Sequence, residues 1–92
     1  MKIADQLQEL ETVAEKKKIR VSYETIGGEL GAGGLCKVKG EHRVIVDKRA
    51  TDGEKVTVLA TALARFDLDD VFVSEEMRQV IARHGKKPSS GS

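Results

Sequence analysis

The chain has 92 residues, of which 39% are hydrophobic and 34% are charged, with 16 Lys and Arg against 15 Asp and Glu. A chain of this length provides one hydrophobic core and no second domain, and its composition is typical of a folded domain rather than a disordered or membrane-spanning chain. The net charge of +1 gives no overall field that would attract nucleic acid or an anionic surface, and the partner cannot be read from net charge. The longest nearly apolar run, residues 56–64, is too short to cross a bilayer, so we expect no membrane partner, and we disfavour a nucleic-acid partner.

The amino end and the cysteine content indicate the compartment. Polar and acidic side chains begin within the first six residues, which is too early for the hydrophobic segment of a secretory signal. The single cysteine, Cys36, has no second cysteine with which to form an internal disulfide. Both features predict a cytoplasmic protein.

The first third of the chain predicts a helix followed by a strand. Apolar residues recur at three- and four-residue spacing over residues 3–17, which is the period of a helix with one buried stripe. Residues 19–23 then alternate apolar and polar, as a strand with one covered face does. The stripe consists of Ile3, Leu7, Leu10, Val13 and Ala14.

A glycine-rich connection and a hairpin follow. Residues 27–34 include five glycines and predict a loop, whereas residues 35–39 and 42–47 are β-prone and flank Gly40-Glu41. Two registers remain open. A two-residue turn would place Val38 opposite Arg43, and a bulged three-residue loop would align Cys36 and Val38 with Val44 and His42.

The second half predicts two more helices. Thr51 and Glu54 have the spacing of a capping box, which favours a helix start, and the helix that follows is apolar on nearly every side from residue 56 to residue 66. After an acidic break, residues 71–73 predict an extended segment, and Ser74 opens a final helix that runs to about residue 83.

These elements predict the fold class. We expect one α+β domain over residues 1–84, with a helix, a three-stranded antiparallel sheet, a central helix, a short extended segment and a C-terminal helix. Residues 85–92 have no apolar periodicity and predict a disordered tail outside the domain.

The residues that could carry chemistry do not assemble into a recognised motif. Cys36, His42 and His84 are the only soft metal ligands, fewer than the four of a structural zinc site. Phe66 to Val71 has two aspartates two apart, as in phosphotransferases of the haloacid dehalogenase type, but follows a capped helix rather than a buried strand. We therefore assign no catalytic, metal or cofactor-binding residue, and expect no cofactor and no enzymatic activity.

The Gly27–Gly34 loop and the basic residues supply the alternative hypotheses. Backbone amides of a glycine-rich loop can converge on an anion, which makes the protein a candidate small-ligand or phosphate binder; the candidate anion contacts are Gly33, Gly34, Lys48 and Arg49. Two groups of basic residues make a weak nucleic-acid binder the other alternative, although no aromatic residues for base stacking are interleaved with them. These groups are Lys16, Lys17, Lys18 and Arg20, and Lys37, Lys39, Arg43, Lys48 and Arg49.

The order of elements from Leu35 to Arg65 resembles the core of minimal zincin-type metallopeptidases, in which two strands precede a helix bearing His-Glu-x-x-His. Thr61, Ala62 and Arg65 stand at the three functional positions of that motif. The resemblance therefore implies an architecture without the peptidase chemistry. Residues 34–38, 45–49 and 64–69 are also similar to small uncharacterised bacterial proteins, a resemblance that implies no activity.

The apolar second helix suggests a function in binding. Few predicted elements are available to cover it, so we expect a non-enzymatic protein-interaction module that docks an apolar helix face or a strand edge to a partner, with a homodimer as one form. The residues expected to form the interaction surface are Val56, Leu59, Leu63, Phe66 and Phe72.

Overall fold

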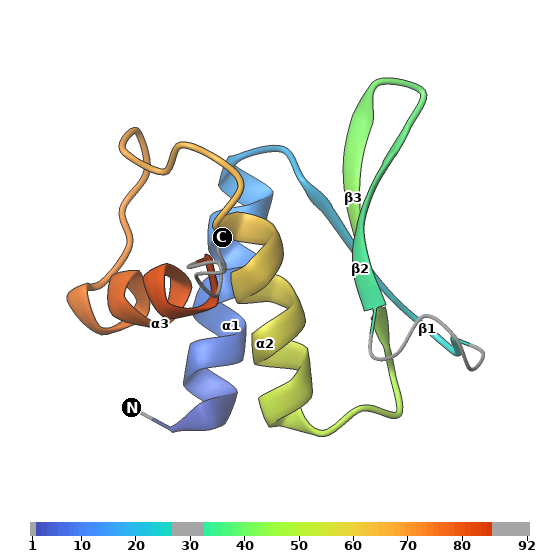
Figure 1. Cartoon of the computed structure of the whole chain (residues 1–92), viewed down its shortest axis with the longest axis horizontal. Helices are drawn as coiled ribbons and strands as arrows, with labels where there is room; N and C mark the ends of the chain where they lie inside the picture. The colour runs from blue at the N-terminus through green and yellow to red at the C-terminus, as the bar shows by residue number, and fades with distance from the viewer. Residues whose placement is uncertain (1, 27–32, 86–92) are drawn as a thin grey trace, which may run out of the picture.

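The computed structural model describes residues 2–26 and 33–85 and contains, within those ranges, three helices and three strands (Figure 1). The helices pack together on one side of a small sheet, which confirms an α+β fold. No described helix has both the length and the apolar character needed to cross a bilayer. The elements in chain order are α1 (Ile3–Lys16), β1 (Arg20–Glu24), β2 (Gly33–Val38), β3 (Glu41–Asp47), α2 (Asp52–Leu63) and α3 (Glu75–Gly85).

Helix α1 ends in a tight turn that sends the chain directly into β1. The amide of Ile19 donates to the carbonyl of Ala14 at 2.9 Å. The amide of Lys18 donates to the carbonyl of Glu15 at 3.0 Å. Lys18 adopts a φ of 62°. These two bonds and the left-handed residue form a Schellman motif, which usually has glycine where this chain has lysine.

Strand β3 is the centre of the sheet, and the expectation of a purely antiparallel sheet is wrong. The strand order is β1-β3-β2. Strand β2 pairs with β3 in antiparallel fashion, but β1 pairs with β3 in parallel, with Val21 opposite Val44. The sheet is mixed because β1 pairs with the second strand of the hairpin rather than with the first, which is its neighbour in sequence.

Both hairpin registers predicted from the sequence are also wrong. The turn is formed by Lys39 and Gly40, with φ values of 52° and 82°. Two consecutive residues with positive φ are characteristic of a type I′ turn, whose twist matches that of the flanking strands. As a result Val38 faces Glu41, and Cys36 faces Arg43.

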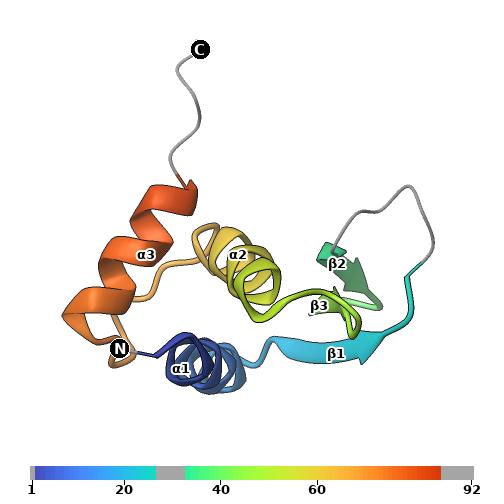
Figure 2. The same cartoon turned by 90° about the horizontal axis from the view of Figure 1, so that it is seen from below.

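Helix α2 begins with the predicted capping box. The amide of Glu54 donates to the Thr51 hydroxyl at 3.1 Å, and the amide of Thr51 donates to the Glu54 carboxylate at 3.0 Å. The helix lies beside α1, with the sheet on one side of this pair and α3 on the other (Figure 2). Its position explains why it is apolar on several sides.

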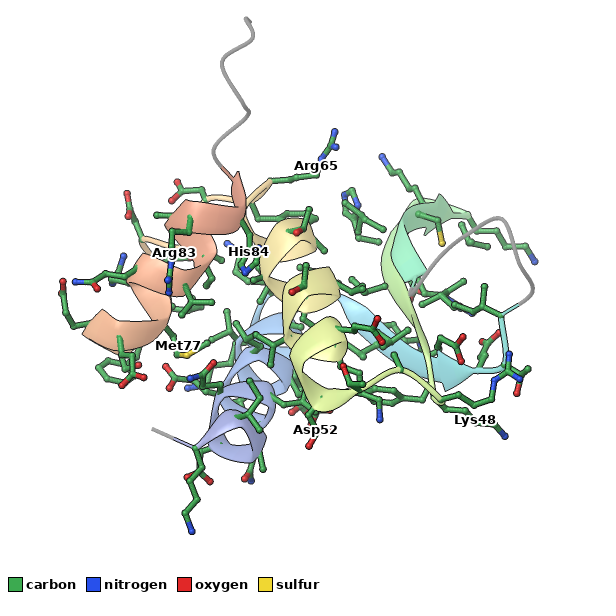
Figure 3. The ribbon with its side chains drawn as sticks, turned by 60° about the horizontal axis from the view of Figure 1, so that its bottom comes forward. Lys48, Asp52, Arg65, Met77, Arg83 and His84 are labelled. Carbon is green, nitrogen blue, oxygen red and sulfur yellow. The ribbon has the colours of Figure 1, made fainter. Side chains whose placement is uncertain are left out.

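Helix α3 is anchored to α1 through its N-terminal cap. The Glu9 carboxylate accepts from the Ser74 amide at 2.7 Å and from the Ser74 hydroxyl at 3.0 Å, and that hydroxyl accepts from the Met77 amide at 3.3 Å. Met77 is fully buried between the helices (Figure 3). The helix continues to Gly85, which had been expected to lie in the tail; residues 86–92 lie outside the described residues. The other fully buried large side chains are Leu10, Val13, Val44, Val46, Leu59 and Leu63.

Candidate functional site

The expected interaction surface on α2 is covered by the protein's own core. Leu59 and Leu63 are 0% exposed and Val56 is 4% exposed. Phe66 is partly buried, with its ring edge-on to that of His42 at a centroid distance of 4.8 Å. Phe72, at 76% exposure, is the member of the set that lies on the surface. These α2 side chains are buried because the helix is packed against the sheet and against α1 and α3, which cover its apolar flanks.

The expected anion site is divided between a strand and a turn. Gly33 and Gly34 belong to β2, where they face Val46 and Ile45, and the rest of the Gly27–Gly34 loop lies outside the described residues. In the turn after β3, the Arg49 guanidinium contacts the Asp47 carboxylate at 3.6 Å and donates to the Ile26 carbonyl at 3.4 Å. Arg49 therefore already has acceptors.

Lys48 is exposed and points away from the body of the molecule (Figure 3). Of the four residues proposed to contact an anion, it is the cation with no salt bridge to another described residue. A single exposed lysine holds an anion only weakly, because solvent and salt screen its charge. The phosphate-binding hypothesis thus gains no convergent set of donors from the described part of the chain.

The residues considered for metal or nucleophilic chemistry are separated. Cys36 lies opposite Arg43, so its side chain is on the other face of the sheet from that of His42. Within residues 2–26 and 33–85, no group of three or more His, Cys, Asp and Glu side chains has the arrangement of a metal site. At the positions that resemble the zincin motif, Ala62 is buried, Thr61 is exposed, and Arg65 extends into solvent (Figure 3).

The two basic groups are spread over several surfaces, although Arg20 of the first lies beside Arg43 of the second in the sheet. The Lys17 ammonium contacts the Asp70 carboxylate at 2.9 Å, and Arg20 lies 4.0 Å from Glu41. Asp70 is exposed, and its hydrogen bond from Lys17 holds the pKa of that carboxyl below its usual value. On the hairpin, Lys37 and Arg43 point to opposite faces, since they occupy alternate positions of the paired strands. The nucleic-acid hypothesis stays a prediction that salt-dependent binding can test.

A polar groove of about 590 Å³ lies between α1 and β1. Its walls include Glu11 and Glu15 from α1 together with Tyr23 from β1. The Tyr23 hydroxyl donates to the Glu11 carboxylate, and the Lys55 ammonium lies 5.5 Å from the centre of the Tyr23 ring. Burial raises the pKa of Tyr23 well above its ordinary value, and the hydrogen bond and negative charge of Glu11 raise it further. The groups that meet here tie β1 to both helices, which gives the cluster a structural role.

The remaining candidate is the face of the sheet turned away from the helices. Val44 and Val46 are fully buried against the helices, so the side chains of the alternate residues of β3 point outward. No described helix covers that face (Figures 1 and 2). Ile45 lies at its centre and is only partly buried, and a Cβ placed on the neighbouring Gly34 would have no atom within 4 Å. We call this surface the open sheet face; its residues are Arg20, Ser22, Glu24, Gly34, Cys36, Val38, Glu41, Arg43, Ile45 and Asp47.

The charges on the open sheet face are arranged in two rows. The parallel register places Arg20 beside Arg43 at one end and Glu24 beside Asp47 at the other. The middle row holds Ser22 and Ile45 in register with Gly34 of β2. The face therefore has a basic row, an uncharged middle row and an acidic row. Glu41 borders the basic row and contacts Arg20, and Arg49 contacts Asp47 of the acidic row.

The basic and acidic rows leave charges without partners. Within the described part of the chain, neither the Arg43 guanidinium nor the Glu24 carboxylate forms a salt bridge or hydrogen bond, and the Arg43 Nε is also shielded from solvent. Like charges placed side by side across two strands destabilise a sheet. The arrangement thus costs the isolated chain free energy that an oppositely charged surface could offset.

Sequence reasoning did not identify this face. The sequence does contain a pattern: in both strands a basic, an uncharged and an acidic residue follow one another at every second position. These residues are Arg20, Ser22 and Glu24 in one strand and Arg43, Ile45 and Asp47 in the other. The meaning of this pattern depends on the parallel pairing of β1 with β3, because an antiparallel pair would place Arg beside acid instead. A comparison of the chain with protein-family models, with curated proteins and with solved structures gives no match.

Proposed function

We propose that this protein is a non-enzymatic protein-interaction module that binds its partner through the open sheet face. The observation that supports it is the outer side of β3, which no described helix covers and where Ile45 lies between a basic row and an acidic row that contain the unpaired Arg43 and Glu24. A flat sheet with one covered face needs solvent or a partner on the other. The uncharged centre offers apolar contact and the charged ends offer orientation, as in the core and rim of protein interfaces.

The proposed mechanism separates affinity from specificity. Burial of Ile45 would supply a favourable apolar term, while the two charged rows would select a surface with the reverse order of charges. Phe72 does not belong to this face, because it lies in the segment between α2 and α3. The earlier expectation of an interaction module is therefore kept, and its surface is moved from α2 to the sheet.

Affinity capture with matched baits tests the proposal. We would tag the wild-type chain, an Ile45→Glu variant and a Thr61→Glu variant, cross-link each to its neighbours in cells that make this protein so that a weakly bound partner is retained, and then recover the bound proteins. Thr61 is exposed on α2, away from the open sheet face, so its variant controls for the added charge. We expect the wild type and Thr61→Glu to recover the same partner, and Ile45→Glu to lose at least about 90% of it, because a buried unpaired charge is costly.

Circular dichroism and thermal unfolding of each bait must first show that the variants fold. The proposal is contradicted if the folded Ile45→Glu variant recovers as much of every partner as the wild type does. A surface on α2 or on the Phe72 segment would then have to be considered instead.

A further inference from the structure

We infer that the partner of the open sheet face is a second copy of this chain, related to the first by a two-fold axis that lies across the strands. This inference rests on the proposed function and names its partner. The axis runs along the row that contains Ser22, Ile45 and Gly34. Rotation by 180° about this line places the second copy's open sheet face over the first. Each strand then lies over the same strand of the second copy, which runs in the opposite direction.

The two-fold axis brings opposite charges together at both ends of the face. Residues two positions before the axis on one copy stand opposite residues two positions after it on the other. Arg20 therefore faces the second copy's Glu24, and Arg43 faces its Asp47. Because a two-fold interface is isologous, each of these contacts occurs twice.

The centre of the face is compatible with the same arrangement. Ile45 stands over its own counterpart on the axis, so two partly buried apolar side chains cover each other. Gly34 lies in the same row and carries no side chain, and the space where a Cβ would lie is empty. The row can therefore approach a second sheet at the usual spacing of about 10 Å between packed sheets.

Charge complementarity favours this partner over an unrelated one. A two-fold rotation about the middle row supplies the reverse order of charges without any further assumption, whereas another partner would have to possess it independently. The dimer also offsets the cost of the like-charged neighbours, because it gives Arg43 and Glu24 partners of opposite charge. Arg20 and Asp47 already contact Glu41 and Arg49, and each gains a second partner. Within the described residues, the unpaired state of Arg43 and Glu24 is then explained.

The size of the face sets the expected strength. Three strands about 4.8 Å apart, with five residues each rising about 3.3 Å, span roughly 15 Å by 15 Å. This patch is smaller than the roughly 800 Å² that each partner buries in a standard stable interface. We therefore expect a reversible dimer that dissociates on dilution, with a dissociation constant above about 1 µM.

Reciprocal charge reversal on β1 tests the arrangement. We would measure the self-association of full-length wild type, Arg20→Glu and Glu24→Arg by sedimentation equilibrium at low salt. Each variant alone places like charges opposite each other twice, so we expect each to dissociate at least about tenfold more readily than the wild type. An equimolar mixture of the two variants restores both pairs, and we expect it to dimerise with an affinity within about threefold of the wild type.

Matched controls on α3 separate this result from an effect of net charge. Arg83→Glu and Glu75→Arg make the same charge changes on exposed positions of a helix that does not contact the sheet. We expect both to associate like the wild type, alone and in mixture. Arg20 and Glu24 are exposed and outside the core, so their variants are expected to fold.

Three outcomes would overturn the two-fold dimer: a wild type that stays monomeric up to about 1 mM, reversals that leave association unchanged, or a mixture that fails to recover it. The proposed function fails separately. It is lost only if Ile45→Glu retains every captured partner, whereas a monomeric wild type whose captured partner is lost in Ile45→Glu identifies a different protein as the occupant.

Discussion

The protonation of Tyr23 is tied to the fold. In the folded protein its neutral hydroxyl donates to Glu11, and burial together with that carboxylate raises the pKa of Tyr23 above its ordinary value, which is about 10. The folded state therefore favours the protonated phenol. The stability that this group contributes is fully present below the ordinary pKa and is lost as the pH rises above it.

We predict that the protein loses stability steadily as the pH rises above about 10. The chain has one tyrosine and no tryptophan, so the near-ultraviolet absorbance of the phenolate reports this group alone. We expect phenolate to form together with unfolding, as followed by circular dichroism, and not before it. Tyr23→Phe should be less stable at neutral pH and should lose this part of the alkaline dependence; ionisation of Tyr23 at its ordinary pKa in a folded protein would contradict the prediction.

The buried positions of α2 show what a sequence does and does not specify about single residues. The apolar character of Val56, Leu59 and Leu63 correctly indicated that water would be excluded from them. Whether the covering surface belonged to the same chain depended on where α1, α3 and the sheet were placed. Hydrophobicity specifies burial but not the identity of the neighbour, so these residues were assigned to an interface.

At the level of elements, the helix starts followed from local signals, whereas α2 ends at Leu63, earlier than the Phe66 expected from its apolar run. Periodicity and caps act within a few residues, and they located α1, the start of α2 and the start of α3 within one residue of the expected positions, α2 through its Thr51 cap. Strand pairing was less accessible. The alternation of residues 19–23 fixes which side chains share a face, but it is the same whether the neighbouring strand is β2 or β3, or runs parallel or antiparallel.

The hairpin register was missed because of one backbone conformation. Lys39 occupies the first central position of the type I′ turn with a φ of 52°, whereas Asn, Asp or Gly is usual there. Both predicted registers required only glycine to take positive φ. Lysine rarely adopts the left-handed conformation, so the sequence does not indicate a turn residue at this position. The turn was therefore predicted one residue too late.

Lys18 presents a second lysine in the left-handed region and allows a test of the α1 terminus. We predict that Lys18→Gly stabilises the protein by about 1 kcal/mol, because glycine relieves the steric cost of positive φ at this position of a Schellman motif. Denaturant unfolding measures the difference. Lys16→Gly, two residues earlier and inside the helix, should have the opposite sign and destabilise by about 1 kcal/mol; a destabilising Lys18→Gly would show that the lysine side chain has an attractive role.

At the scale of the whole molecule, the layer arrangement decides which face is available. In the described part of the chain, three helices on one side of a three-stranded sheet leave its other side open (Figure 2). The open sheet face did not follow from the sequence, since it requires the strand order β1-β3-β2 and the parallel register that aligns Arg20 with Arg43. A long-range pairing of this kind has no local signature.

Because the inferred dimer binds only folded chains, its formation should raise the thermal stability of the protein by mass action. We predict that the unfolding temperature of the wild type rises by roughly 3 to 6 °C between about 10 µM and 1 mM protein. The Ile45→Glu variant removes the apolar centre and should unfold at the same temperature across this range. Scanning calorimetry measures both, and an equal rise in the variant would place the self-association, if any, on a surface other than the open sheet face.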